Sequence, residues 1–189
     1  MTARAIFLDK DGTLVENVPM SADPDRMRLR AGAADALRRL RDAGFRFAVV
    51  TNQAGVALGA FPERALEAVA KRLGALLDGT GVRLEGFHYC PHHPSATISQ
   101  YRMVCDCRKP APGLVLNAAR ALGADVEQCW MVGDILDDVE AGRRAGCRTV
   151  LLNTGGETEW ILTRSRTPDF VASTFGQVAD YILGEPARP

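Results

Sequence analysis

The 189-residue sequence has no run of 18 apolar residues, so we expect no membrane-spanning helix. It also lacks net charge, because 23 basic residues balance 23 acidic ones, and no basic excess indicates a nucleic acid as the main partner. The first apolar run begins within a few residues of Met1, which leaves no room for a secretory signal segment. We therefore expect one domain at residues 1–184, a short tail at 185–189, and a monomeric protein.

Cysteine is scarce, and the five cysteines are an odd number. Cys90, Cys105 and Cys107 lie in one short stretch that also contains histidine, which is not the spacing of a disulfide framework. The other two, Cys129 and Cys147, fall in apolar contexts typical of a core. This distribution favours a metal site in a reducing compartment, the cytoplasm.

What the sequence does contain is an alternation of short apolar runs with amphipathic segments. It predicts a strand just before Asp9 and further strands at 45–50, 87–89, 129–132 and 149–152. Helices are predicted at 31–43, 62–77, 112–122, 137–145 and 175–182. This order predicts an α/β fold with a Rossmann-like, doubly wound parallel sheet that helices cover on both faces.

The first apolar run ends in two aspartates one residue apart, Asp9 and Asp11, followed by Gly12. If the strand conformation continues through Lys10, both carboxylates lie on the same face, where one metal ion or phosphate could meet both. A carboxylate can attack phosphorus, and a second carboxyl can protonate the departing alkoxide. The pair is therefore a candidate catalytic site.

Three further polar residues stand at comparable positions. Thr51 ends the second apolar run, Asp134 ends a later one, and Lys109 precedes a predicted helix. Ligands of doubly wound sheets bind at the carboxyl ends of the strands, so we expect Asp9, Thr51 and Asp134 to converge there.

In this order, Asp9, Thr51, Lys109 and Asp134 resemble the motifs of the haloacid dehalogenase superfamily of aspartate-nucleophile hydrolases. The resemblance spans roughly residues 4–155. It implies a phosphomonoesterase in which Asp9 is the nucleophile and Asp11 is the general acid and base.

The resemblance also implies a catalytic Mg²⁺, held by an Asp9 oxygen, the Asp11 backbone carbonyl, the Asp134 carboxylate and waters. Mg²⁺ and Lys109 would neutralise the charge on the phosphoryl group, and Thr51 would hydrogen-bond it. The remaining side chains near the motifs are expected to bind substrate: Asn52, Gln53 and Arg108.

A second metal site is predicted in the segment 90–107. Cys90 and His92 form C-x-H, and after twelve intervening residues Cys105 and Cys107 form C-x-C. Three thiolates and one imidazole complete a tetrahedral Zn²⁺ shell, and a closed shell of four protein ligands is structural. His93 is an alternative to His92.

The segments around these ligands, C-P-H-H-P and C-D-C-R-K, look like the zinc-loop branch of the superfamily, which contains heptose bisphosphate phosphatases and histidinol phosphatases. The likeness implies a small phosphorylated sugar as substrate, with the 7-phosphate of D-glycero-D-manno-heptose 1,7-bisphosphate as the named candidate and histidinol phosphate as the alternative. No large insertion follows the first strand or Thr51, so we expect a minimally capped, open site. The chain departs from the branch at 18–20 and at Leu58 and Ile135, where two cations of the branch are missing.

Two non-enzymatic functions fit part of the pattern. A phosphorylatable signalling domain also combines Asp, Thr, Lys and Mg²⁺ on a parallel sheet, and a zinc-stabilised binding module would need no catalysis. Asp11 argues against the first, and the presence of every proposed catalytic side chain argues against the second. Asp138, four residues after Asp134, is either a support of the metal site or an acid at a helix N-terminus.

Overall fold

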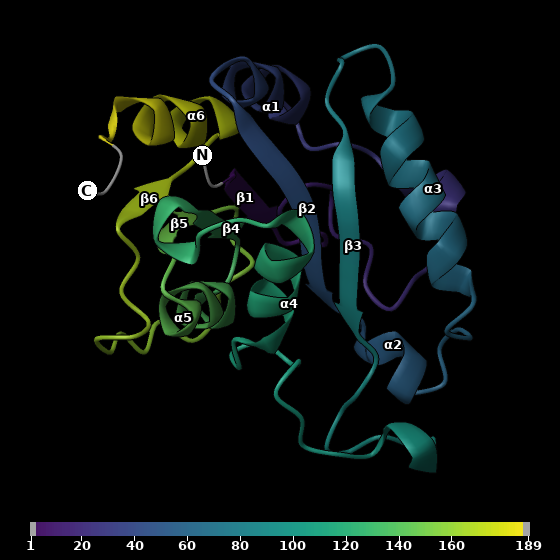
Figure 1. Ribbon diagram of the computed structural model, residues 1–189. Helices are drawn as coiled ribbons and strands as arrows, with labels where there is room; N and C mark the ends of the chain where they lie inside the picture. The colour runs from purple at the N-terminus through teal and green to yellow at the C-terminus, as the bar shows by residue number, and fades with distance from the viewer. Residues whose placement is uncertain (1–2, 187–189) are drawn as a thin grey trace.

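A computed structural model of the protein describes residues 3–186. Its centre is a six-stranded sheet in the order β3-β2-β1-β4-β5-β6, in which every neighbouring pair is parallel (Figure 1). The strands are β1 (Arg4–Leu8), β2 (Phe45–Asn52), β3 (Leu84–Cys90), β4 (Trp130–Gly133), β5 (Arg148–Leu152) and β6 (Phe170–Ala172).

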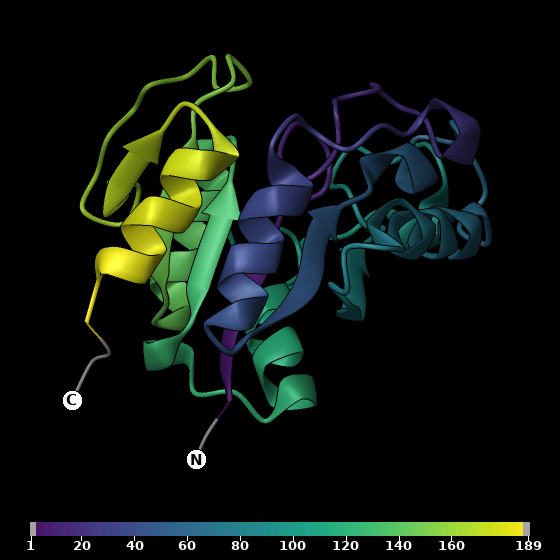
Figure 2. The ribbon, with the colours of Figure 1, turned by 90° about the horizontal axis from the view of Figure 1, so that it is seen from above.

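Helices cover both faces of this sheet. The α-helices are α1 (Ala33–Asp42), α2 (Ala54–Ala57), α3 (Ala65–Leu77), α4 (Gly113–Leu122), α5 (Leu136–Ala145) and α6 (Phe175–Gly184). Three short 3₁₀ turns complete the elements: η1 (Pro24–Arg26), η2 (Ser99–Tyr101) and η3 (Val126–Gln128). Figure 2 shows α1 and α6 side by side on one face.

The alternation of side chains along β1 explains why two cores form. Ile6 and Leu8 pack with apolar residues of α1, α3 and α6, whereas Ala5 and Phe7 pack with those of α4 and α5. These four side chains are all buried, as expected for a central strand of a parallel sheet.

The strand order places a topological switch point between β1 and β4. From β1 the chain builds outward to β2 and β3 on one side, and β4 then begins the other half of the sheet. Segments that leave the carboxyl ends of β1 and β4 therefore part in opposite directions and leave a crevice between them. Asp9 follows β1 directly, and Asp134 follows β4.

The predicted fold class is confirmed, and the differences are local. α3 begins at Ala65 rather than at Pro62, since residues 63–64 form a turn. β6 was not predicted, because it has only three residues and depends on pairing with β5. In the predicted tail, Pro186 contacts the rest of the protein, since Arg148 donates to its carbonyl at 3.0 Å. The other tail residues at 187–189 lie outside the described part.

No helix among the described residues is both long and apolar enough to cross a membrane.

Candidate active site

The chain turns sharply directly after β1, between Asp9 and Leu14. The Asp9 N–H still donates to the Val132 carbonyl of β4 at 2.9 Å, but the Asp9 carbonyl already accepts from the Leu14 N–H at 3.3 Å. Gly12 adopts a left-handed φ of 84°, which glycine tolerates without steric cost. The strand ends at Leu8, so the condition under which both carboxylates would share a strand face is not met, but both residues line the same cavity.

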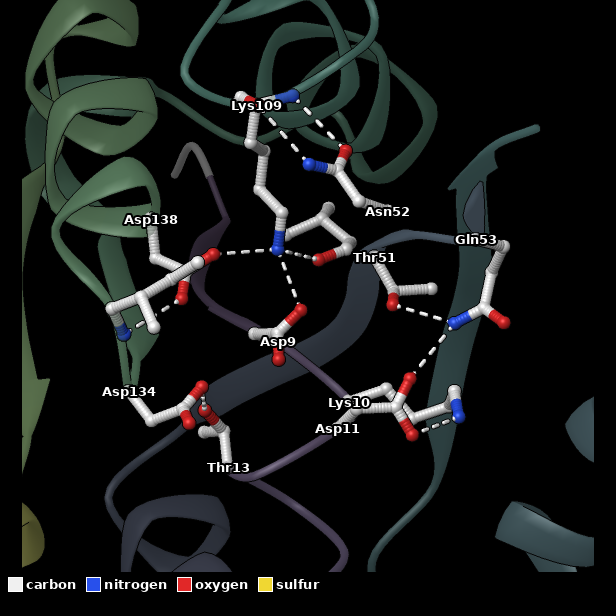
Figure 3. Close-up of polar contacts among 12 residues, drawn as sticks. Asp9, Lys10, Asp11, Thr13, Thr51, Asn52, Gln53, Lys109, Asp134 and Asp138 are labelled. Carbon is white, nitrogen blue, oxygen red and sulfur yellow. Dashed lines mark hydrogen bonds and ion pairs between the residues drawn. The ribbon is translucent and has the colours of Figure 1, made fainter. Parts of the chain in front are cut away.

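Lys109 lies at the centre of the site (Figure 3). Its ammonium pairs with Asp9 Oδ1 and with Asp138 Oδ1, each at 2.6 Å, and donates to the Val50 carbonyl at 2.9 Å. The lysine is only 2% exposed, so its charge is compensated by protein groups rather than by water. Asp138 thus has a definite partner, and its carboxylate also accepts from the Ile135 N–H at the start of α5.

Asn52 fixes the backbone from which Lys109 extends. Its amide Nδ2 donates to the Lys109 carbonyl at 3.0 Å, and its Oδ1 accepts from the Lys109 N–H at 3.0 Å. This reciprocal pair joins the end of β2 to the segment before α4. The amide of Asn52, which the sequence suggested as a substrate ligand, is therefore occupied by the protein itself.

Burial dominates the electrostatics of the carboxylates. It raises the pKa of Asp9 to about 7, although the Lys109 ammonium opposes this rise. It raises the pKa of Asp134 to about 6, with a further contribution from the Asp9 charge. Burial would lower the pKa of Lys109, but the charges of Asp138 and Asp9 outweigh it and raise that pKa.

The carboxylates of Asp9, Asp134 and Asp138 can each place one oxygen within 4.8 Å of the others, which suits a hard cation. A methyl group at Gly12 or at Gly156 would overlap Asp134 Oδ2, so both glycines leave room for this carboxylate. The Thr13 hydroxyl donates to Asp134 Oδ1 at 3.2 Å and orients it. The Asp11 carboxylate is not in this group, so a metal contact from Asp11 would have to use its backbone carbonyl, as the resemblance implies.

The Asp11 carboxylate instead faces the end of β2. One oxygen pairs with the Lys10 ammonium, and the other accepts from Gln53 Nε2 at 3.0 Å. The same Nε2 donates to Thr51 Oγ1 at 2.9 Å. Asp11, Gln53 and Thr51 therefore form one connected set on the opposite side of Asp9 from Asp138 (Figure 3).

The predicted residues surround a cavity of about 210 Å³. Gln53 lines an adjoining cavity of about 120 Å³, and Arg108 lines another of about 310 Å³, which shares Lys109 with the first. Sequence reasoning gave no site role to Thr13 or Asn17, since neither a position in a loop nor the residue type distinguishes them. The first cavity is lined by Asp9, Asp11, Asn17, Thr51, Asn52, Lys109, Asp134, Ile135, Asp138 and Gly156.

The four predicted zinc ligands converge at the end of β3. Cys107 Sγ lies 3.2 Å from the sulfurs of both Cys90 and Cys105, and 3.3 Å from His92 Nδ1. These separations resemble the edges of a tetrahedron around one zinc ion, and all three cysteines are free. The His93 Nδ1 instead accepts from the Ser95 N–H at 3.1 Å, so His92 is the histidine of this cluster.

Comparison with known proteins accords with this geometry. Residues 106–178 match a family model described as HAD-hydrolase-like. The chain is 42% identical over 152 residues to the D-glycero-beta-D-manno-heptose-1,7-bisphosphate 7-phosphatase of Escherichia coli strain K12, covering 80% of each chain. The chain belongs to the HAD-like hydrolase family. A relative of the same name from Yersinia pestis is 37% identical over 167 residues, covering 84% of this HAD-like hydrolase and 89% of the relative.

Solved structures of HAD-like proteins have the same fold. A putative HAD-like phosphatase from Mesorhizobium loti superimposes with a TM-score of 0.83 and 30% identity, covering 99% of this chain and 90% of the other. The D,D-heptose 1,7-bisphosphate phosphatase from B. bronchiseptica, complexed with magnesium and phosphate, gives a TM-score of 0.77 at 30% identity, with coverages of 97% and 99%.

The raised pKa of Asp134 makes a prediction for stability without Mg²⁺. A carboxyl that titrates at about 6 in the folded protein, but at about 4 when unfolded, binds more protons folded, so its contribution to stability falls as pH rises from 4 through 6. We therefore expect the free energy of unfolding of Asp134→Asn, measured with urea in Mg²⁺-free buffer, to rise relative to that of wild type by on the order of 1 kcal/mol between pH 5 and pH 8. A constant difference across this range would contradict the raised pKa.

Proposed function

We propose that the protein is a Mg²⁺-dependent phosphomonoesterase that removes the 7-phosphate of D-glycero-β-D-manno-heptose 1,7-bisphosphate. The observation that carries the proposal is the buried Asp9–Lys109–Asp138 arrangement beside Asp134, which offers an oriented carboxylate and a place for a cation. The printed names of the relatives from E. coli and Y. pestis support the substrate.

In the first step, an Asp9 carboxylate oxygen attacks phosphorus and the bond from phosphorus to the sugar oxygen breaks. The sugar alkoxide takes a proton from the Asp11 carboxyl group, which becomes a carboxylate. The products of this step are the free sugar hydroxyl and an aspartyl-phosphate on Asp9.

In the second step, the Asp11 carboxylate takes a proton from water while the water oxygen attacks phosphorus. The bond from phosphorus to Asp9 breaks, which releases inorganic phosphate and restores the Asp9 carboxylate. Asp11 ends the cycle protonated, ready for the next substrate, so each turnover consumes one ester and one water.

Charge compensation is the main task of the remaining groups. Bound Mg²⁺ would supply Lewis-acid stabilisation of the phosphoryl oxygens, and the carboxylates of Asp9 and Asp134 fit it. Lys109 pairs with Asp9 and so lowers the repulsion between this carboxylate and a phosphate dianion. We assign Asn52 to holding Lys109 in place, because both ends of its amide bind the Lys109 backbone.

Recognition of the sugar would occur outside the catalytic cavity, which at about 210 Å³ accommodates a phosphate with its metal rather than a whole heptose bisphosphate. Arg108 lines the adjoining cavity of about 310 Å³ and is proposed to contact substrate there. Ile135, which stands where the branch has a cation, lines the catalytic cavity. Val18 and Met20, which also differ from the branch, line the cavity of about 120 Å³ beside it. These three differences therefore lie where they can alter substrate specificity.

We further propose that Cys90, His92, Cys105 and Cys107 hold a structural Zn²⁺. The cluster links the end of β3 to the segment that carries Arg108 and Lys109, and Arg108 itself donates to the His92 carbonyl at 3.2 Å. A zinc ion here would therefore order the loop that delivers Lys109 to the site. Free thiols at such spacing suit a reducing compartment, the cytoplasm.

Phosphate release from a panel of esters tests the proposed function. With Mg²⁺, wild type should prefer heptose 1,7-bisphosphate over histidinol phosphate and other sugar phosphates, and Asp9→Asn should lose roughly 10³-fold or more of this activity. The amide keeps the shape of the carboxylate but cannot attack phosphorus. Preference for another ester would reject the substrate, and full activity of Asp9→Asn would reject the mechanism.

Metal analysis tests the zinc proposal. Purified wild type should contain about one zinc per chain, and Cys107→Ser should contain less and unfold at a lower temperature, because metal binding contributes to folding. Cys147→Ser is a matched control, since Cys147 is a buried cysteine outside the cluster and should leave the zinc content unchanged. Equal zinc content in the two variants would contradict the assignment.

A further inference from the structure

We infer that Gln53 is a positioning residue, which holds the general acid Asp11 and the hydroxyl of Thr51 in register with the phosphoryl group. The inference rests on the proposed phosphatase function. It replaces the expectation that Gln53 binds substrate, because the side-chain amide contacts two site residues of the protein: Nε2 lies 3.0 Å from Asp11 Oδ2 and 2.9 Å from Thr51 Oγ1.

The chemistry of the donors fixes the orientation of this amide. In the ionised state that Asp11 has between the two proposed steps, its carboxylate only accepts hydrogen bonds, so the Gln53 atom that faces it is then the nitrogen, as the structure has it. That nitrogen has two protons, and one serves Asp11 while the other serves Thr51. Thr51 Oγ1 is therefore an acceptor toward Gln53, which leaves its single hydroxyl proton for the phosphoryl oxygen that the family resemblance implies it binds.

The position of Gln53 is itself tightly fixed. Its backbone N–H donates to the Cys90 carbonyl at 2.8 Å, and its carbonyl accepts from the Val56 N–H at 3.1 Å at the start of α2. The residue is 4% exposed. Because the backbone of Gln53 is fixed and its side chain is buried, the side chain loses little conformational entropy when it hydrogen-bonds Asp11 and Thr51. A positioning residue requires such rigidity.

Asp11 has a second partner, which shows what Gln53 adds. The Lys10 ammonium binds Asp11 Oδ1, but it extends from the adjacent residue and so cannot fix Asp11 relative to β2. Gln53 supplies that link, since it joins Asp11 to Thr51 across the site. Without Gln53 the Asp11 carboxyl group would keep its ion pair with Lys10 but would no longer be held in position relative to the reacting phosphate.

A dependence on the leaving group distinguishes this role from a purely structural one. A sugar or other alkyl alkoxide needs the Asp11 proton to leave, whereas 4-nitrophenolate is a stable anion and needs little help. Misplacement of Asp11 should therefore slow release of an alkyl alcohol much more than release of 4-nitrophenol. A general disturbance of the fold, of Asp9 or of the metal would slow both reactions alike.

The experiment measures the pre-steady-state release of alcohol from an alkyl phosphate and from 4-nitrophenyl phosphate by wild type and Gln53→Met. Methionine retains much of the volume of glutamine but donates no hydrogen bond. We expect the ratio of the alkyl rate to the aryl rate to fall about tenfold, a part of the usual contribution of a general acid. Gln177→Met, at the start of α6 and outside the three cavities described above, should leave the ratio unchanged.

Other outcomes would overturn the inference. An increase in KM with unchanged kcat would make Gln53 a substrate ligand, and an equal loss for both esters would make it a structural residue. In the Asp11→Asn background, Gln53→Met should slow alcohol release from the alkyl phosphate little further, since the general acid is already removed; full additivity on this ester would contradict a role through Asp11. If Gln53→Met does not fold, Gln53→Ala serves, because the site borders an open cavity. An inactive wild type would instead refute the proposed function.

Discussion

A buried ammonium between two buried carboxylates is the interaction on which the site depends. Lys109, Asp9 and Asp138 are each nearly inaccessible to water, and each comes from a different segment of the chain. An isolated charge at such depth is costly, whereas a paired and hydrogen-bonded one is tolerated. Loss of Lys109 would leave two buried carboxylates without a cation, so the three segments are held to a common arrangement.

The sheet topology is what allows this arrangement to form. β1 and β4 are neighbours at the switch point, so Asp9 and Asp134 emerge beside one another although 125 positions separate their numbers. The segment before α4 then returns over the end of β2, where Asn52 holds the Lys109 backbone. The Cys/His cluster constrains the same segment from its other end. Asn52 and the Cys/His cluster therefore both help to hold Lys109 beside the carboxylates.

Periodicity and motif order predicted the fold class and part of the lining of the proposed catalytic cavity, because both leave patterns in the sequence. The predicted members of this lining are Asp9, Asp11, Thr51, Asn52, Lys109 and Asp134. These patterns did not predict that the strand ends before Asp9, which depends on a turn fixed by the Leu14 N–H and permitted by Gly12. The sequence also did not predict the partners of Asn52 and Gln53, since a side-chain amide next to Thr51 can equally bind substrate or protein. Tertiary contacts decide between these two.

Reductive trapping during turnover tests most directly the claim that Asp9, held by Lys109, is the attacking group. Borohydride reduces an acyl phosphate of aspartate to homoserine, which peptide mass spectrometry locates in the chain. Wild type that is turning over substrate should carry homoserine at position 9, and protein without substrate should carry none. Continued turnover without this modification, or homoserine at position 11 instead, would contradict the account.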